Sequence, residues 1–230
     1  MINKIIRTRQ EMKTTICLLA ILTTLMACSK NDDRMKEKAA LESESSTSSQ
    51  IRVENENQAN KAEKMELDLT KRHRFYQAVK GTYEGDIKTN LGVFNIRITL
   101  TPSLAPTPLN RVRQLEEIAS DLNGLAMNAQ VVQWDPNNTN SAVGCRMSGI
   151  KPDIIKGELA ISTESCPNLY LIKITERGFV ASAAENAEVA LRIAKQVLNG
   201  DLSDVDSISG QVQPSTNASI FKFVANKVQE

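Results

Sequence analysis

From residue 81 onward, apolar and polar residues alternate along several short stretches of the chain. This alternation is typical of β-strands that bury one face and expose the other. It is clearest over 94–100, where the residues on one face are Phe94, Ile96, Ile98 and Leu100. A strand over 82–89 precedes it, and turn-forming residues at 89–92 join the two. The pattern predicts a hairpin with one buried face.

Six more stretches have the length and residue types of strands: 125–134, 142–149, 158–163, 169–175, 207–213 and 218–225. The last two are separated by turn-forming residues at 214–217, which predicts a second hairpin. Successive hairpins build an antiparallel sheet, and closing that sheet removes its free edges. The sequence therefore predicts a mainly β fold, an antiparallel barrel or sandwich of about eight strands with one or two helices.

The strongest helix signal lies between 182 and 200, before the last hairpin. Ser182 and Glu185 have the spacing of a capping box, and Gly200 suits the C-terminal end. An apolar stripe follows one side of this late amphipathic helix, with Val189, Ile193, Val197 and Leu198.

Two other stretches have weaker helical patterns. Thr107 as N-cap and Pro108 at the first position predict a helix that ends near Gly124, although an irregular loop with a short strand also fits. A short helix within 65–81 is expected to bury one face and to begin the folded domain. The residues of that face are Leu67, Leu69, Phe75, Tyr76 and Val79.

The N-terminus combines a positive segment with an apolar run at 16–26 that is broken only by Cys17, Thr23 and Thr24. The run is too short to span a hydrocarbon core, which needs roughly 20 apolar residues. Its length and flanks are those of a secretory signal, for which Met12 is an alternative start.

The run Leu25-Met26-Ala27-Cys28 closes this segment and resembles the lipobox of bacterial lipoproteins. The resemblance implies cleavage before Cys28 and attachment of diacylglycerol to its sulfur, often with a further acyl chain such as palmitate on the new amino group. Two or three acyl chains make a stable membrane anchor. Ser29 stands where Asp would signal inner-membrane retention, so the resemblance favours the outer membrane, facing either the periplasm or the surface.

The stretch after Cys28 is rich in Ser, Glu, Lys and Asn and contains no aromatic residue up to residue 64. Such a segment buries too little apolar surface to offset its ordering entropy, so a flexible tether is predicted. As a coil of about 36 residues, it would span roughly 30–35 Å. The expected organisation is a removed signal at 1–27, a lipidated N-terminus and tether at 28–64, and a single β-rich domain at 65–230.

Cys145 and Cys166 are the thiols that remain beyond Cys28, and two cysteines in an exported chain most simply form a disulfide. If they face each other across paired strands at 142–149 and 158–163, opposed residue numbers sum to 311, which places Met147 against Glu164. Removing the signal takes four basic and one acidic residue from 28 and 27, leaving 24 and 26 and a net charge of −2. This balance and the 4% aromatic content argue against nucleic-acid binding.

The sequence offers little catalytic chemistry. His73 is the single histidine and lies in the basic run Lys71-Arg72-His73-Arg74, which is more typical of a solvated helix face than of a membrane contact. Glu84 and Asp86 share a strand face, an arrangement open to a carboxylate pair such as that of a glycosidase, but any solvent-facing strand gives this spacing. Asp201, Asp204 and Asp206 lack the other positions of an EF-hand. No catalytic residue, metal site or cofactor is predicted.

We therefore expect a non-enzymatic, lipid-anchored envelope protein whose β domain binds another envelope protein or has a structural role. The alternative is a carrier with a small apolar ligand inside the barrel, because the late helix and the opening Gly81–Gly85 run resemble lipocalin-like barrels, although their Gly-x-Trp signature is absent. A cavity would favour the carrier, whereas a filled core would favour the binding module. An envelope hydrolase that uses carboxylates is the third possibility.

Overall fold

This computed structural model describes residues 33–104, 114–162, 166, 168–179, 181–214 and 219–229, with side chains from residue 50 onward except that of residue 139. The chain divides into two compact units, 1–55 and 56–230, and each is considered by itself.

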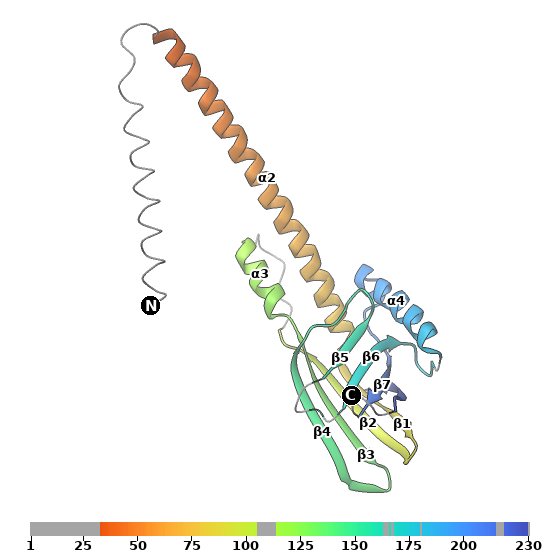
Figure 1. The fold of residues 1–230 in the computed structure, drawn as a ribbon. Helices are drawn as coiled ribbons and strands as arrows, with labels where there is room; N and C mark the ends of the chain where they lie inside the picture. Colours follow the sequence, from red (N-terminus) through yellow and green to blue (C-terminus); the bar gives the residue numbers. More distant parts are fainter. Residues whose placement is uncertain are drawn as a thin grey trace, which may run out of the picture. The chain divides into compact units, whose positions relative to one another are not determined.

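The described part of the first unit is helical and belongs to α2 (Asp33–Val79), which continues into the second unit (Figure 1). The side chains described between 50 and 61 are exposed. The flexible coil predicted over 28–64 is therefore replaced by a helix from Asp33 onward. The prediction considered only apolar burial, whereas Ala, Glu, Lys and Gln favour helix and a helix satisfies its backbone hydrogen bonds locally.

In the second unit, the last turns of α2 bury Leu69, Phe75, Tyr76 and Val79, as their helical spacing predicts. Leu67 is the exception, since 53% of it is exposed. The boundary at Glu56 also lies before the predicted domain start at Met65, because the helix is already continuous there.

One antiparallel sheet contains the eight strands of the described residues, in the order β4-β3-β2-β1-β8-β7-β6-β5 (Figure 1). The strands are β1 (Gly81–Thr89), β2 (Gly92–Pro102), β3 (Met127–Asp135), β4 (Asn138–Ile150), β5 (Glu158–Ile161), β6 (Leu169–Thr175), β7 (Ser207–Gln213) and β8 (Phe221–Lys227). The end strands β4 and β5 approach each other without forming a backbone ladder, so the sheet is a nearly closed barrel. The predicted fold class is confirmed.

The described residues contain three helices, where one or two were predicted: α2, α3 (Leu115–Gly124) and α4 (Ala183–Asn199). The end of α3 at Gly124 agrees with the prediction, but the helix begins at Leu115, after Gln114, and Thr107 and Pro108 lie outside the described residues. The capping box of α4 is formed as predicted, with Glu185 N donating to Ser182 Oγ and Ser182 N donating to a Glu185 carboxylate oxygen. Gly200 follows this helix with a φ of 88°, which a left-handed cap requires.

The structure shows which strands lie next to each other in the sheet. The hairpins β1–β2 and β7–β8 pair as predicted. The predicted pairing of 142–149 with 158–163 is wrong, because β4 pairs with β3 and β5 pairs with β6. The register that sums to 311 therefore does not exist; Cys145 lies opposite Val131, and Glu164 is outside the described residues.

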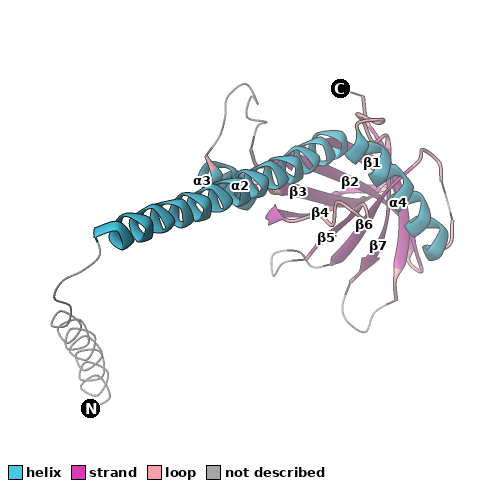
Figure 2. Ribbon diagram, turned by 90° about the horizontal axis from the view of Figure 1, so that it is seen from above, coloured by secondary structure: helices cyan, strands magenta, loops and turns pink. Residues whose placement is uncertain are grey.

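The inward face of the sheet is packed with apolar side chains. Ile96, Ile98 and Leu100 of β2 are fully buried, while Arg97 between them is exposed. α4 packs on β6 and buries Ala190, Ile193, Ala194 and Val197 (Figure 2). These residues and the end of α2 form one continuous hydrophobic core with the inward strand residues. Apolar burial on this face supplies the main stabilisation of the domain.

Candidate functional site

The seam between the two ends of the sheet is closed by side chains. The Sγ atoms of Cys145, on β4, and Cys166, between β5 and β6, lie 2.16 Å apart in a disulfide. Gln133 Nε2 donates to the Tyr170 hydroxyl at 2.8 Å, which links β3 to β6. Asn168 Nδ2 donates to the same hydroxyl at 3.1 Å. The predicted cysteine pair is thus brought together, but as a link across the seam and not within a paired ladder.

Cys28, the predicted lipid attachment site, lies outside the described residues. Within the part of the chain that the structure describes, none of the helices has the length and apolar character needed to span a membrane.

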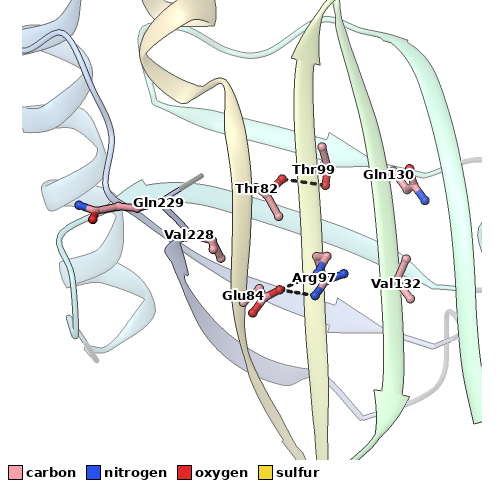
Figure 3. Close-up of a pocket in the computed structure, with 8 residues that line it drawn as sticks. All are labelled: Thr82, Glu84, Arg97, Thr99, Gln130, Val132, Val228 and Gln229. Atoms are coloured by element: carbon pink, nitrogen blue, oxygen red, sulfur yellow. Dashed lines mark hydrogen bonds and ion pairs between the residues drawn. The ribbon is translucent and has the colours of Figure 1, made fainter. Parts of the chain in front are cut away.

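A polar ladder covers the outward face of β1, β2 and β3 (Figure 3). Arg97 donates through Nε to Glu84 Oε1 at 2.6 Å, and its guanidinium lies 5.6 Å from the centre of the Trp134 ring. The hydroxyls of Thr82 and Thr99 are 3.2 Å apart. Thr82, Glu84, Arg97 and Thr99 line a groove of about 420 Å³. Because the Glu84 and Arg97 side chains are 41% and 52% exposed, their ion pair contributes at most about 1 kcal/mol.

Glu84 and Asp86 share the outward face, as their spacing predicts, but each has its own surroundings. Glu84 is paired with Arg97, whereas Asp86 lies opposite Asn95 on β2 and Val224 on β8. With its amide oriented to suit both neighbours, Asn95 donates to Asp86 Oδ1 and accepts from Trp134 Nε1, each at 3.1 Å. The arrangement is a surface hydrogen-bond network on a strand face and not a pair of facing carboxylates in a cleft.

A larger hollow lies on the outward face of β6, β7, β8 and β1, and we call it the β6–β1 groove. Its volume is about 670 Å³. The segment before α4 and the first turn of α4 form one wall, through Phe179, Ala181, Ala183 and Asn186. Asn186 is fixed there because its Oδ1 accepts a hydrogen bond from Ser209 Oγ of β7 at 3.4 Å. This hydrogen bond links the first turn of α4 to β7 at the groove.

Strand registers show which groove residues are neighbours. Leu171 lies opposite Gln211, and Gln211 lies opposite Lys222, so these three form one row across β6, β7 and β8. Ile87 pairs with Phe223, and the next residues in that register are Lys88 and Lys222. The row therefore changes from apolar at β6 to basic at β8 and β1. In the neighbouring row, Lys173, Ser209, Val224 and Asp86 follow one another.

The charges in the β6–β1 groove are unevenly matched. Lys173 Nζ lies 2.6 Å from Glu158 Oε1, and both side chains are mostly buried. Lys88 and Lys222 are exposed and, among the described residues, have no ion-pair partner. Asp86 is the carboxylate that lines the groove with them. Like charges at opposed strand positions repel each other, so the β8–β1 side of the groove favours an anion.

The three tyrosines of the chain serve the core. Burial raises the pKa of Tyr76, Tyr83 and Tyr170, and the carboxylates of Asp204 and Asp206 raise that of Tyr83 further. The Tyr83 hydroxyl donates to the Val79 carbonyl oxygen at 3.0 Å and to the Val205 carbonyl oxygen at 3.1 Å. It thereby ties the end of α2 to the segment before β7. All three hydroxyls stay protonated near neutral pH; that of Tyr83 donates to backbone carbonyls, whereas that of Tyr170 accepts from Gln133 and Asn168.

The other predicted candidates are engaged in separate structural contacts. Lys227 forms an ion pair with Asp204, and its backbone N–H donates to the Asp206 carbonyl oxygen at 2.8 Å. Within the described ranges, no three His, Cys, Asp or Glu side chains gather as a metal site. In the basic run, Arg72 pairs with Asp68 at 3.0 Å.

Arg74 of the same run donates to the Leu198 carbonyl oxygen at 3.2 Å. A cation near the C-terminal end of α4 complements the helix dipole. His73 is half-buried on α2 beside these residues. The basic run therefore helps to join α2 to α4.

The residues of the β6–β1 groove were not predicted from the sequence. Leu171 and Lys173 lie on one face of the predicted strand 169–175, but no site was assigned to that face. The signal that was available is the presence of apolar Leu171 and Val224 on the outward phase of strands that also carry lysines. Only the strand order places these outward positions beside one another.

Comparisons with known protein families, with curated proteins and with solved structures find no match to this chain.

Proposed function

We propose that this chain is a lipid-anchored protein of the bacterial cell envelope whose β domain binds a partner through its outward face. The anchor rests on the run Leu25-Met26-Ala27-Cys28 after a basic and then apolar segment. In this proposal, Cys28 carries the lipid, the outer membrane is the favoured location, and no enzymatic activity is required.

One observation carries the proposal for the domain: the inward face is filled, while the hollows described above lie on the outward face. Tyr83, Ile98, Leu159 and Ile172 each have no exposed surface, and they belong to one continuous core. A carrier of the lipocalin kind needs space inside its barrel. The filled core therefore supports binding on the outside over transport of an apolar ligand inside.

The contacts of the carboxylates support a binding role over a hydrolytic one. A glycosidase needs two carboxyl groups about 5–10 Å apart across a substrate cleft. Glu84 is held by Arg97, and Glu158 is held by Lys173. These carboxylates stabilise strand pairs, and we assign them no catalytic step.

The anchor is tested with two matched cysteine variants of the full chain, Cys28→Ala and Cys17→Ala, expressed in a Gram-negative host with labelled palmitate. We expect Cys28→Ala to lose the label and the membrane-fraction signal of the processed protein. Cys17→Ala changes a cysteine of the same N-terminal segment and is expected to keep both. Label that persists in Cys28→Ala would contradict the anchor.

The partner is tested by placing a photo-reactive amino acid at the exposed Gln130, in the outward groove of β1, β2 and β3, or at the exposed Lys195 of α4 as the control. We expect a discrete crosslink to an envelope protein from position 130 alone. Equal crosslinking from both positions would indicate random collision and contradict binding through the outward face.

A further inference from the structure

The β6–β1 groove has features of a ligand site that the proposed partner-binding role does not require. We infer that it binds a small amphipathic anion: a molecule with one acidic head group and an apolar body of fatty-acid size. This inference is independent of the anchor, because the described residues that line the groove lie between Gly85 and Asn226.

The size of the hollow sets the class of ligand. A volume of about 670 Å³ falls within the roughly 300–1,000 Å³ of small-molecule sites. Protein partners instead bind on broad surfaces that bury about 800 Å² on each side. A groove of this size therefore fits a small molecule better than a folded partner.

The head group is assigned to the β8–β1 side. Lys88 and Lys222 each lie one residue beyond the Ile87–Phe223 pair of β1 and β8, and Asp86 precedes Lys88 by two residues on the same strand face. An acidic head group between the two ammonium groups would relieve their repulsion and form charge-assisted hydrogen bonds. The N-terminus of α4 is not needed for this, because Glu185 already accepts the Ser182 N–H there.

The apolar body is assigned to the β6 side of the same groove. Leu171 and Phe179 are half-buried there and line the wall away from Lys88. Lys173 lies on that side as well, but Glu158 neutralises it. The groove is therefore amphipathic along the strand rows, with its apolar end and its basic end separated by β7.

The edge of the groove continues this pattern. Leu169, two residues before Leu171 on the same face of β6, is 40% exposed, and Ile220, the residue before β8, is 55% exposed. Val93, opposite Lys88 on β2, is 46% exposed. Exposed apolar side chains gathered around a hollow indicate a binding site more often than scattered ones do.

The test uses the chain from 29 to 230, which keeps every residue that the structure describes, and laurate below its micelle-forming concentration as the probe. Dodecyltrimethylammonium has the same chain length and the opposite charge. Calorimetric titration is expected to show one laurate per chain and much weaker binding of the cation. Absence of laurate binding, or equal affinity for the two probes, would overturn the inference.

Three variants locate the ligand. Replacing both Lys88 and Lys222 by Gln is expected to weaken laurate binding about tenfold or more, as loss of a charge-assisted hydrogen bond does. Leu171→Asn is expected to weaken laurate binding, because it removes an apolar contact at the β6 side of the groove. Lys195→Gln removes an exposed lysine of α4 and is expected to change the affinity by less than about twofold. Unchanged affinity in the lysine and Leu171 variants would place the ligand elsewhere and overturn the assignment.

Vesicles distinguish a free amphiphile from a membrane surface. The same chain is sedimented with vesicles of phosphatidylglycerol or of phosphatidylcholine. The small-ligand site is supported if laurate binding is weakened in the lysine variants and the chain does not sediment with either vesicle. Sedimentation on phosphatidylglycerol without laurate binding would show that the lysines bind an anionic bilayer, and the inference would be wrong.

Discussion

The inward face of the sheet is apolar and buried, whereas its outward face is polar and partly exposed. On β2, Ile98 points inward and is fully buried, whereas its neighbour Thr99 points outward into the polar groove of Figure 3. The inward face gains stability from apolar burial. The outward face is held by exposed pairs such as Glu84 and Arg97, which stabilise little and remain free to contact a ligand. In this protein, stability and binding are thus assigned to opposite faces of the same strands.

The largest test of this comparison uses these two adjacent residues. Ile98→Ala is expected to lower the free energy of unfolding by about 2–5 kcal/mol, because it leaves a cavity in the core. Thr99→Ala removes an exposed-face hydroxyl contact and is expected to cost less than about 1 kcal/mol. Urea unfolding measures both. Similar losses in the two variants would show that the faces are not divided in this way.

The seam offers the next test, because it keeps the inward face enclosed where the backbone ladder is missing. Replacing both Cys145 and Cys166 by Ala is expected to lower the free energy of unfolding by about 3 kcal/mol, since the bond closes a loop with a sequence separation of 21. A reducing agent should lower the melting temperature of the unmodified chain in the same direction. It should leave the double variant unchanged, and an effect there would mean that another group responds.

The tyrosines test whether water reaches the inward face. Burial raises the pKa of all three tyrosines above the usual value of about 10, so the folded state holds these protons more tightly than the unfolded state. Their stabilising effect is complete below about pH 10 and is lost as the pH rises through the folded pKa values. Ultraviolet absorbance should therefore show tyrosinate only together with alkaline unfolding. A separate titration near pH 10 in the folded protein would show that water reaches the core.

The smallest effect is expected on the outward face. Glu84→Gln removes the ion pair with Arg97 and is expected to cost less than about 1 kcal/mol at low salt, and still less at high salt. Glu188→Gln, on the exposed side of α4, serves as the control. A loss of several kcal/mol in Glu84→Gln alone would mean that the outward ladder is a second source of stability.

How far the sequence predicts this fold depends on the range over which each feature acts. The strand 169–175, the capping box of Ser182 and Glu185, and the final hairpin follow from local spacing, and the structure confirms them. The start of α3 and the helix over Asp33–Lys64 were predicted wrongly, because both depend on local propensities that several conformations share. The β6–β1 groove was not predicted at all.

The sequence by itself determined which residues of each strand face inward, because side chains alternate with a period of two whatever the neighbours are. It also determined the late helix and the lipobox-like run that predicts an anchor at Cys28. Only the tertiary structure decided that β1 lies beside β8, that Cys145 and Cys166 join the seam, and that Leu171, Lys222 and Lys88 border one hollow. Strand order is set by backbone hydrogen bonds and packing between distant segments, and no local pattern along the chain encodes those contacts.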